Sequence, residues 1–157
     1  MNKSLSKPVS KSVAKNRRAY HDYEVLETVE AGILLRGSEI KAVREGGAQL
    51  KGSYVTFLGE TPLLTNVHIA PYKPAAGQQH DPTRSRRLLL KKSEIARLFG
   101  MIKTQGVTIV PLELYIKGKW AKVLIGVVRG KKLHDKRRDI KERETKLRAA
   151  RAVGRRR

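Results

Sequence analysis

The stretch Val107–Val128, VTIVPLELYIKGKWAKVLIGVV, predicts the longest β-hairpin of the chain. Two runs rich in apolar and β-branched residues flank Gly118, and glycine favours the turn between paired strands. Pro111 has no main-chain N–H to donate, so we expect it at a bulge or at a sheet edge. The stretch therefore indicates an antiparallel β protein.

Other stretches upstream predict further strands. Tyr23–Leu35, YEVLETVEAGILL, suggests two adjacent strands with a bulge or turn at Gly32. Ser53–Gly59 and Pro62–Ala70 are rich in β-branched and aromatic residues and predict a second hairpin. Together with Val107–Val128, these stretches predict at least six short strands.

Two helices have clear start and stop signals. Glu39–Gly47 follows a capping serine and ends in a glycine pair, whereas Ser93–Gly106 begins with its own capping serine and ends in glycine. The second helix has one apolar face that can pack against a sheet, formed by Ile95, Leu98, Phe99 and Ile102. Pro71–Arg87, rich in proline and small polar residues, predicts a long, mobile loop before it.

These elements predict a fold that is mainly β with helices. We expect an OB-like antiparallel β-barrel with two to three short helices and basic, largely disordered terminal tails. An α+β open sheet is the alternative. The expected division is a disordered basic arm over 1–13, an OB-like body over 14–130 and a basic tail over 131–157.

The charge of the chain is concentrated at its two ends. Met1–Arg18 has six Lys and Arg residues and no acid, and Lys131–Arg157 has thirteen against four acids. These segments thus carry +15 of the formal net charge of +21. Two basic arms around a body of ordinary charge indicate a polyanionic partner, whose counterions are released when the arms bind. A solubilising role for the tail is the alternative.

Several classes of function find no support in the sequence. The chain has no cysteine, which removes thiol nucleophiles and cysteine zinc sites, and its four histidines lack a metal-ligand spacing. Phosphate-binding glycine loops, a secretory signal and long apolar segments are also missing from the sequence. A histidine is followed directly by an aspartate at His21-Asp22, His80-Asp81 and His134-Asp135. Adjacent positions in the sequence are poor evidence for a catalytic dyad, which requires a defined geometry. We therefore expect no enzyme, no cofactor, no metal and no membrane partner.

The last hairpin carries the residue types that bind RNA. Lys117, Lys119 and Lys122 surround Trp120, so cations can follow phosphates while the ring offers a stacking face. A single tryptophan in a strand can equally belong to the core. The tail beyond Gly130 has helix formers but almost no apolar face, so we expect it to gain structure only on an anionic surface.

Six motifs, in order, resemble the SmpB family. They are N-x-x-A-x-H-x-Y at Asn16–Tyr23, E-A-G at Glu30–Gly32, G-x-E-I-K at Gly37–Lys41, DPTRSRRLLL at Asp81–Leu90, LYIKGKWAKV at Leu114–Val123, and GKKLHDKR with DIKERE within Gly130–Glu144.

The resemblance implies a cytoplasmic bacterial RNA-binding adaptor without catalytic chemistry. Such a protein holds the tRNA-like domain of tmRNA on an OB-like body, as one copy per tmRNA and a monomer when free. Its tail enters the decoding centre and empty mRNA channel of a stalled small ribosomal subunit during trans-translation, and is helical there.

The family's functional residues are transferred through these motifs. The tmRNA face is expected to include Asn16, His21, Tyr23, Glu30, Leu89 and Lys122. The ribosomal tail is expected to include Lys131, Lys132, His134, Asp135, Lys136, Arg137, Asp139, Ile140, Lys141 and Arg143. Two rivals remain: a ribosomal protein or RNA chaperone that does not select tmRNA, and a nuclease or RNA-modifying enzyme that uses His21 or His134.

Overall fold

The hairpin predicted at Val107–Val128 forms the longest strand pair. The computed structural model describes residues 10–75, 77, 79–131 and 133–154. In it β8 (Thr108–Lys117) and β9 (Trp120–Gly130) pair antiparallel around Gly118, whose φ of 62° is left-handed. Their register shifts between Pro111 and Glu113, which confirms the predicted bulge at Pro111.

Five more strands extend this hairpin into one curved sheet. Its order is β1-β8-β9-β2-β7-β5-β4, and every pairing in it is antiparallel. The added strands are β1 (Ser10–Lys15), β2 (Tyr23–Ile33), β4 (Tyr54–Leu58), β5 (Thr61–Thr65) and β7 (Arg86–Leu89). A separate short pair joins β3 (Ala48–Gln49) to β6 (His68–Ile69).

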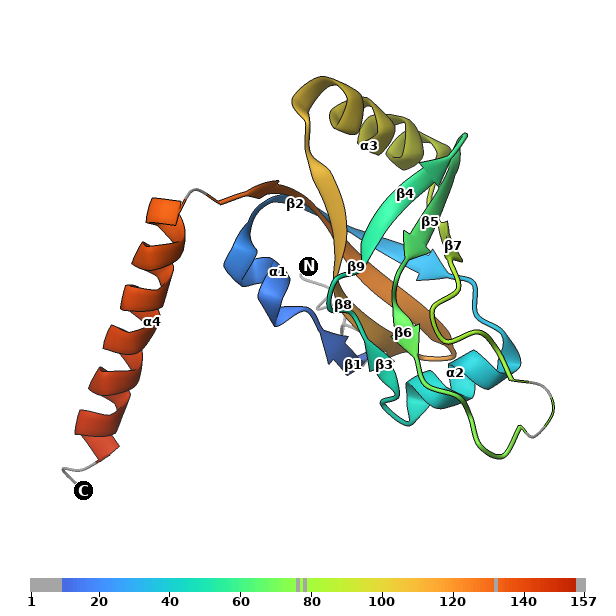
Figure 1. The fold of residues 1–157 in the computed structure, drawn as a ribbon, viewed down its shortest axis with the longest axis horizontal. Coiled ribbons are helices and arrows are strands. Elements are labelled where there is room, and N and C mark those ends of the chain that lie inside the picture. The colour runs from blue at the N-terminus through green and yellow to red at the C-terminus, as the bar shows by residue number, and fades with distance from the viewer. Residues whose placement is uncertain (1–9, 76, 78, 132, 155–157) are drawn as a thin grey trace, which may run out of the picture.

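The sheet curls until its last strand, β4, contacts β8 (Figure 1). Within the described residues no strand pairing joins β4 to β8, so the barrel stays open along this line. We call this line the seam. The predicted fold class, mainly antiparallel β with OB-like curvature, is confirmed, and the seam is where closure is incomplete.

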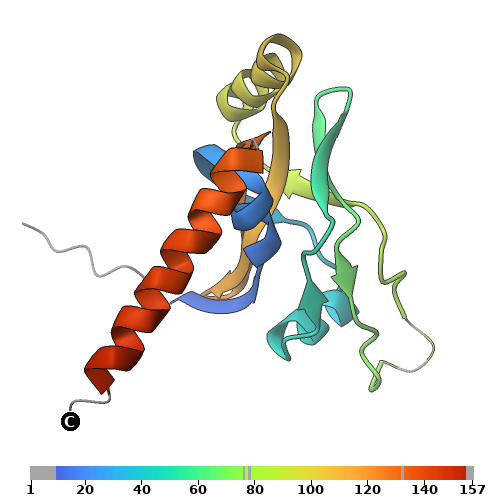
Figure 2. The same cartoon turned by 60° about the vertical axis from the view of Figure 1, so that its left-hand side comes forward.

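Four helices accompany the sheet in the described part of the chain. They are α1 (Arg17–Asp22), α2 (Gly37–Arg44), α3 (Lys92–Gln105) and α4 (Leu133–Gly154). The two helices with sequence signals are α2 and α3, and α3 ends at Gly106 with a left-handed φ of 59°. Figures 1 and 2 show α2 and α3 at opposite ends of the sheet, and α4 extending away from the body past α1.

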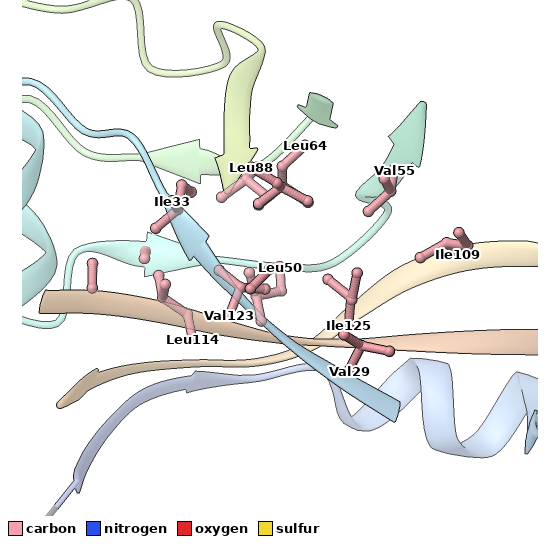
Figure 3. Packing of buried hydrophobic residues seen from close by; sticks show 14 of the residues in the cluster. Val29, Ile33, Leu50, Val55, Leu64, Leu88, Ile109, Leu114, Val123 and Ile125 are labelled. Carbon is pink, nitrogen blue, oxygen red and sulfur yellow. The ribbon is translucent and has the colours of Figure 1, made fainter. Parts of the chain in front are cut away.

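Apolar side chains fill the inside of the curved sheet. Leu64 of β5 and Leu88 of β7 point into the same interior as Val123 and Ile125 of β9, with Leu50 among them (Figure 3). A smaller cluster lies on the other face of β8 and β9, where Ala19 of α1 packs with Val110, Leu112 and Val128. This second cluster fixes α1 to the outer face of the sheet.

The predicted break at Gly32 is wrong. Strand β2 runs continuously through this residue, and its register shift lies between Val25 and Glu27 instead. Gly32 has another reason to lack a side chain: a Cβ there would lie 3.2 Å from the Cβ of Leu89 on the paired strand β7. The glycine therefore permits close packing of two strands.

The N-terminal arm is ordered earlier than we expected. We expected a disordered arm over 1–13, but β1 begins at Ser10 and pairs with β8 over Glu113–Lys117. Main-chain hydrogen bonds at a sheet edge require few apolar side chains, so a Ser- and Lys-rich segment can still form a strand. Residues 1–9 lie outside the described residues.

The stretch Pro71–Arg87, predicted as a long, mobile loop, is anchored in the core at its end, where Arg86 and Arg87 begin β7. Arg86 is fully buried, and its guanidinium donates to the carbonyl oxygens of Val67 at 2.8 Å and Pro82 at 3.1 Å. Its partner is the fully buried carboxylate of Glu39, which also accepts from Arg84 Nε at 2.9 Å. An arginine can satisfy several buried acceptors at once, and here it fixes the start of β7.

The tail also differs from the expectation of a largely disordered segment, because α4 is one continuous helix. It is rich in strong helix formers, and Arg138 Nε lies 3.3 Å from Glu142 Oε1, one turn away. Such residues and pairs support a helix that has no packed face. Among the described residues, no helix is apolar over a length that would cross a membrane.

Candidate nucleic-acid interface

The outer face of the sheet gathers residues predicted to bind RNA. Tyr115 of β8 lies opposite Lys122 of β9, Lys122 opposite Gly32 of β2, and Gly32 opposite Leu89 of β7. These residues form one row across four strands, and Glu30 follows on the same face of β2. We call Glu30, Leu89, Tyr115, Lys117 and Lys122 the sheet face.

The glycine in this row leaves a hollow in the surface. A groove of 520 Å³ is lined by Glu30, Gly32, Leu89 and Lys122, among others. Ligand sites in proteins are commonly of about 300–1,000 Å³. Leu89 is half exposed although it is apolar. The sheet face therefore offers a carboxylate, an ammonium group and an apolar surface within one groove.

Glu30 is held ionised at the centre of the sheet face. The hydroxyl of Tyr115 donates to its carboxylate, and Lys117 Nζ lies 3.6 Å from Glu30 Oε1. The Tyr115 hydrogen bond, helped by Lys117 and Lys122 and opposed by burial, lowers the pKa of Glu30. Burial and the neighbouring Glu30 raise the pKa of Tyr115, so the phenol keeps its proton. A fixed carboxylate can accept hydrogen bonds from a base edge while the lysines meet phosphates.

Trp120 lies at the exposed end of the last hairpin. Of the two alternatives for this residue, core or surface, the structure shows the surface, because Trp120 is 71% exposed. Lys117 lies opposite it, and Lys119 is exposed in the adjacent turn. A bare indole between two cations provides the stacking surface that unpaired bases use.

The side chain of Asn16 is buried and holds two elements together. It is 6% exposed, and its Oδ1 caps α1 by accepting from the main-chain N–H of Ala19 at 3.2 Å. Its Nδ2 donates to the carbonyl oxygen of Pro111 at 2.9 Å. Asn16 therefore positions α1 on β8.

His21 and Tyr23 lie at the end of α1, at the opposite end of the outer face from Trp120. Tyr23 packs partly on the cluster that holds α1. His21 Nδ1 is 2.9 Å from Asp22 Oδ1, so these adjacent side chains do meet. The bond with His21 is the main reason that the pKa of Asp22 is lowered, with burial opposing it and Arg18 and Lys136 adding to it.

The other histidine-aspartate step in the described body is structural. His80 is buried, with Nε2 3.0 Å from the carbonyl oxygen of Ile69 and Nδ1 2.9 Å from Ser38 Oγ. Asp81 accepts instead from the main-chain N–H of Thr83. Within the described residues no group of three or more His, Asp or Glu side chains has the arrangement of a metal site.

The predicted tail residues divide into two groups. Lys131 Nζ donates to the carbonyl oxygen of Tyr20 at 3.0 Å and forms an ion pair with Asp139, and Lys136 Nζ lies 3.8 Å from Asp22 Oδ1. These contacts tie the base of α4 to α1. The exposed tail residues are Arg137, Ile140, Lys141 and Arg143. Lys132 lies outside the described residues, as do the side chains of His134 and Asp135 in the first turn of α4.

Sequence reasoning missed Tyr115 and the buried pair of Glu39 and Arg86. The only signal for Tyr115 was its two-residue spacing from Lys117, which places both side chains on one face of a strand. Glu39 and Arg86 belong to motifs that were noted, but charged residues are rarely fully buried.

An exposed aromatic and cationic sheet face on an OB-like fold, with a basic helix beyond it, defines a small nucleic-acid-binding protein. The family model described as "SmpB protein" matches residues 13–155. The chain therefore belongs to the SmpB family.

Individual relatives agree with this assignment. An SsrA-binding protein of Microcystis aeruginosa is 48% identical over 146 residues, which cover 92% of this chain and 95% of the relative. One of Listeria monocytogenes is 51% identical over 142 residues, covering 90% and 92%. A solved structure described as "tmRNA-SmpB: a journey to the center of the bacterial ribosome" contains a chain with 48% identity and a TM-score of 0.64, covering 76% of this chain and 84% of that one.

Proposed function

We propose that this protein is an RNA-binding adaptor for trans-translation, which binds the tRNA-like domain of tmRNA and delivers it to stalled ribosomes. The names of the relatives support the RNA partner, since they are called SsrA-binding proteins and the similar solved chain is described with tmRNA and the bacterial ribosome. Such an adaptor acts in the cytoplasm, as one copy per tmRNA.

The sheet face is the proposed tmRNA contact. The observation that carries this proposal is the carboxylate of Glu30, held ionised by Tyr115 between Lys117 and Lys122 beside the groove at Gly32. A fixed acceptor among cations can discriminate base edges, whereas a purely cationic face binds any polyanion. Trp120 and Lys119 extend this contact at the tip of the hairpin.

The exposed cations of α4 are the proposed ribosomal contact. Its cations Arg137, Lys141 and Arg143 project from a helix that extends away from the body (Figure 2). A helix of this charge suits a narrow channel lined by RNA phosphates. We assign it to the decoding centre and the empty mRNA channel of the small subunit.

We propose no catalytic role for the protein. Both ring nitrogens of His80 are within hydrogen-bonding distance of structural partners, and His21 shares Asp22 with the cations Arg18 and Lys136. A general base needs a free nitrogen with defined access to the reacting proton. Turnover of labelled RNA that disappears in His21→Ala or His134→Ala would contradict this assignment.

A competition titration tests the tmRNA contact. The labelled tRNA-like domain of tmRNA is titrated with the full chain over a salt series, with bulk tRNA as competitor. We expect a preference for the tRNA-like domain that survives moderate salt. Lys122→Ala should weaken binding and reduce the salt slope by about one. Glu30→Gln should reduce the preference over bulk tRNA.

The matched control is Lys103→Ala, which removes an exposed lysine from α3 rather than from the sheet face. It should leave the preference unchanged. A wild-type protein that binds both RNAs equally at moderate salt would instead be a general RNA chaperone or ribosomal protein, and the proposal would fail.

A further inference from the structure

The base of α4 is held against α1 by polar contacts. Lys131 Nζ donates to the carbonyl oxygen of Tyr20 at 3.0 Å, and the main-chain N–H of Lys131 donates to the carbonyl oxygen of Asp22 at 3.1 Å. The same Nζ forms an ion pair with Asp139 of α4, and Lys136 Nζ lies 3.8 Å from Asp22 Oδ1. We call Tyr20, Asp22, Lys131, Lys136 and Asp139 the junction.

Charge contacts, rather than apolar packing, hold α4 in the part of the chain that the structure describes. The large apolar residues Ile140, Leu147 and Val153 of α4 are all exposed. Strand β9 ends at Gly130, and α4 begins three residues later, at Leu133. Because glycine restricts the backbone little, this short connection can act as a pivot. The contacts of the junction oppose such a movement.

Burial distinguishes Lys131 and Lys136 from other cations of the tail. The side chain of Lys131 is 15% exposed and that of Lys136 is 32% exposed, whereas Arg137, Lys141 and Arg143 are exposed. An ammonium group has three donors, and the Nζ of Lys131 already has two partners within the protein. These two lysines are therefore engaged by the body before any RNA is present.

Asp22 connects the junction to a rigid part of the body. Its carboxylate also accepts from Arg18 Nε at 3.3 Å and lies 2.9 Å from His21 Nδ1. Helix α1 itself is fixed to the sheet, because Asn16 bonds to β8 and Ala19 packs on the outer face of β8 and β9. A helix tied to α1 is thus oriented relative to the whole sheet.

We propose that Lys131 and Lys136 are positioning residues, which set the direction of α4 through α1 instead of contacting ribosomal RNA. The inference rests on the proposed role of α4 on the ribosome, and it changes the role that the family resemblance implies for these two lysines. A helix whose direction is already set loses less freedom on entering a narrow channel. The exposed cations further along α4 then meet the RNA.

Two nitroxide spin labels on the full chain measure the direction of α4. The chain has no cysteine, so Ala96→Cys on α3 and Ala149→Cys on α4 provide two unique attachment sites, both exposed. Pulsed electron spin resonance gives the distribution of distances between the labels. We expect one narrow distribution in the otherwise unchanged chain and a broader one with Lys131→Ala or Lys136→Ala. Equal widths in all three proteins would overturn the inference.

Matched variants separate direction from charge and from helix content. Lys141→Ala removes an exposed lysine of the same helix beyond the junction and should leave the distribution unchanged. Asp22→Lys combined with Lys136→Asp rebuilds the ion pair in reverse and should narrow the distribution again. Circular dichroism should show the same helix content in every variant, since alanine favours helix. A loss of helix content that accounts for the broadening would overturn the inference.

Tagging of peptides on stalled ribosomes distinguishes positioning from direct contact. Lys136→Ala should reduce tagging about five-fold or more, because fewer molecules hold α4 in the productive direction. The exchanged pair should restore most of the tagging. A lysine that met ribosomal phosphate directly would leave the exchanged variant as defective as Lys136→Ala, and this result would overturn the inference. The proposed function fails on a different result, namely no preference of wild-type protein for the tRNA-like domain over bulk tRNA.

Discussion

The phenol of Tyr115 reaches over strand β9 to donate a hydrogen bond to the carboxylate of Glu30 on β2. The two residues are 85 positions apart in the sequence, and β9 lies between their strands. The bond fixes the direction of the Glu30 carboxylate on an exposed surface, where it would otherwise rotate. A fixed acceptor is pre-organised for one ligand geometry.

Tyr115→Phe should therefore raise the pKa of Glu30 towards its ordinary value of 4.5, because the hydrogen bond from Tyr115 is the main cause of its lowering. The bond stabilises the ionised form of Glu30. Its contribution to the stability of the fold is therefore complete above the ordinary pKa of 4.5 and is lost as pH falls through the lowered pKa. We expect the free energy of unfolding to fall by about 1 kcal/mol at neutral pH. The fall is smaller than for a buried hydrogen bond to a charged group, because solvent screens this exposed pair. Urea unfolding of the wild-type protein and of Tyr115→Phe measures this fall. If the two proteins differed in stability by the same amount at neutral and at strongly acid pH, this account would be contradicted.

The sequence predicts those parts of the fold that depend on local patterns. Gly118, Pro111 and Gly106 mark a turn, a bulge and a helix end, and each does so in the structure. Such features depend on the conformational limits of single residues. The OB-like class follows from counting these elements and their spacing.

The parts that sequence could not predict depend on which strands become neighbours. Gly32 resembles a break in a strand until Leu89 is placed beside it, and Tyr115 is unremarkable until Glu30 is within reach. Arg86 has the sequence signature of a loop cation, yet it is fully buried because Glu39 is buried with it. The sequence also left open whether Trp120 faced the core, because Trp120 is the first residue of β9, beside the turn of the hairpin.

Glu39→Gln should destabilise the fold by about 3–5 kcal/mol, since it leaves buried arginine charge without its partner. Burial raises the pKa of Glu39, but hydrogen bonds from Arg84 and Arg86 outweigh burial, and the net pKa lies below the ordinary 4.5. The pair's contribution is therefore present above that value and lost as pH falls through the lowered pKa.

Denaturant unfolding at several pH values measures this effect. The control Glu60→Gln changes an exposed carboxylate in the turn between β4 and β5, and should alter the free energy of unfolding by less than about 0.5 kcal/mol. A similarly small change for Glu39→Gln would show that the buried cluster is unimportant for stability.

Gly126→Ala should destabilise the cluster under α1. A Cβ at Gly126 would lie 2.7 Å from Leu112 Cδ1 and 3.1 Å from its Cγ, so the leucine must move within a packed site. Overpacking of this kind costs about 1–3 kcal/mol. Gly100→Ala is the matched control, because a Cβ there meets nothing within 4 Å inside α3. Alanine should stabilise that helix by about 0.5–1 kcal/mol, and thermal unfolding should show shifts of opposite sign.

Asp139→Asn should loosen the base of α4 from α1. The hydrogen bond from Lys131 lowers the pKa of Asp139 below its ordinary 3.8, so the ion pair persists above that value and is lost as pH falls through the lowered pKa. Amide hydrogens of the first turns of α4 should then exchange on the order of a few-fold faster at neutral pH. Glu142→Gln breaks only the pair with Arg138 further along the helix and should leave those first turns unchanged.

Deleting residues 131–157 should separate the two RNA contacts. The sheet face lies in the body, so we expect the preference for the tRNA-like domain to remain. The affinity should fall by less than about ten-fold, as phosphate contacts of the tail are lost. Tagging of peptides on stalled ribosomes should be abolished, because the cations of α4 have gone.

Replacing Arg137, Lys141 and Arg143 together by alanine distinguishes tail charge from tail helicity. Alanine is the strongest helix former, so α4 should persist while three of its exposed cations near the body are removed. A large loss of tagging by this variant, with tmRNA binding retained, would assign the ribosomal contact to those charges. If deletion of the tail reduced tmRNA preference as strongly as tagging, the division of the protein into two RNA-binding parts would be wrong.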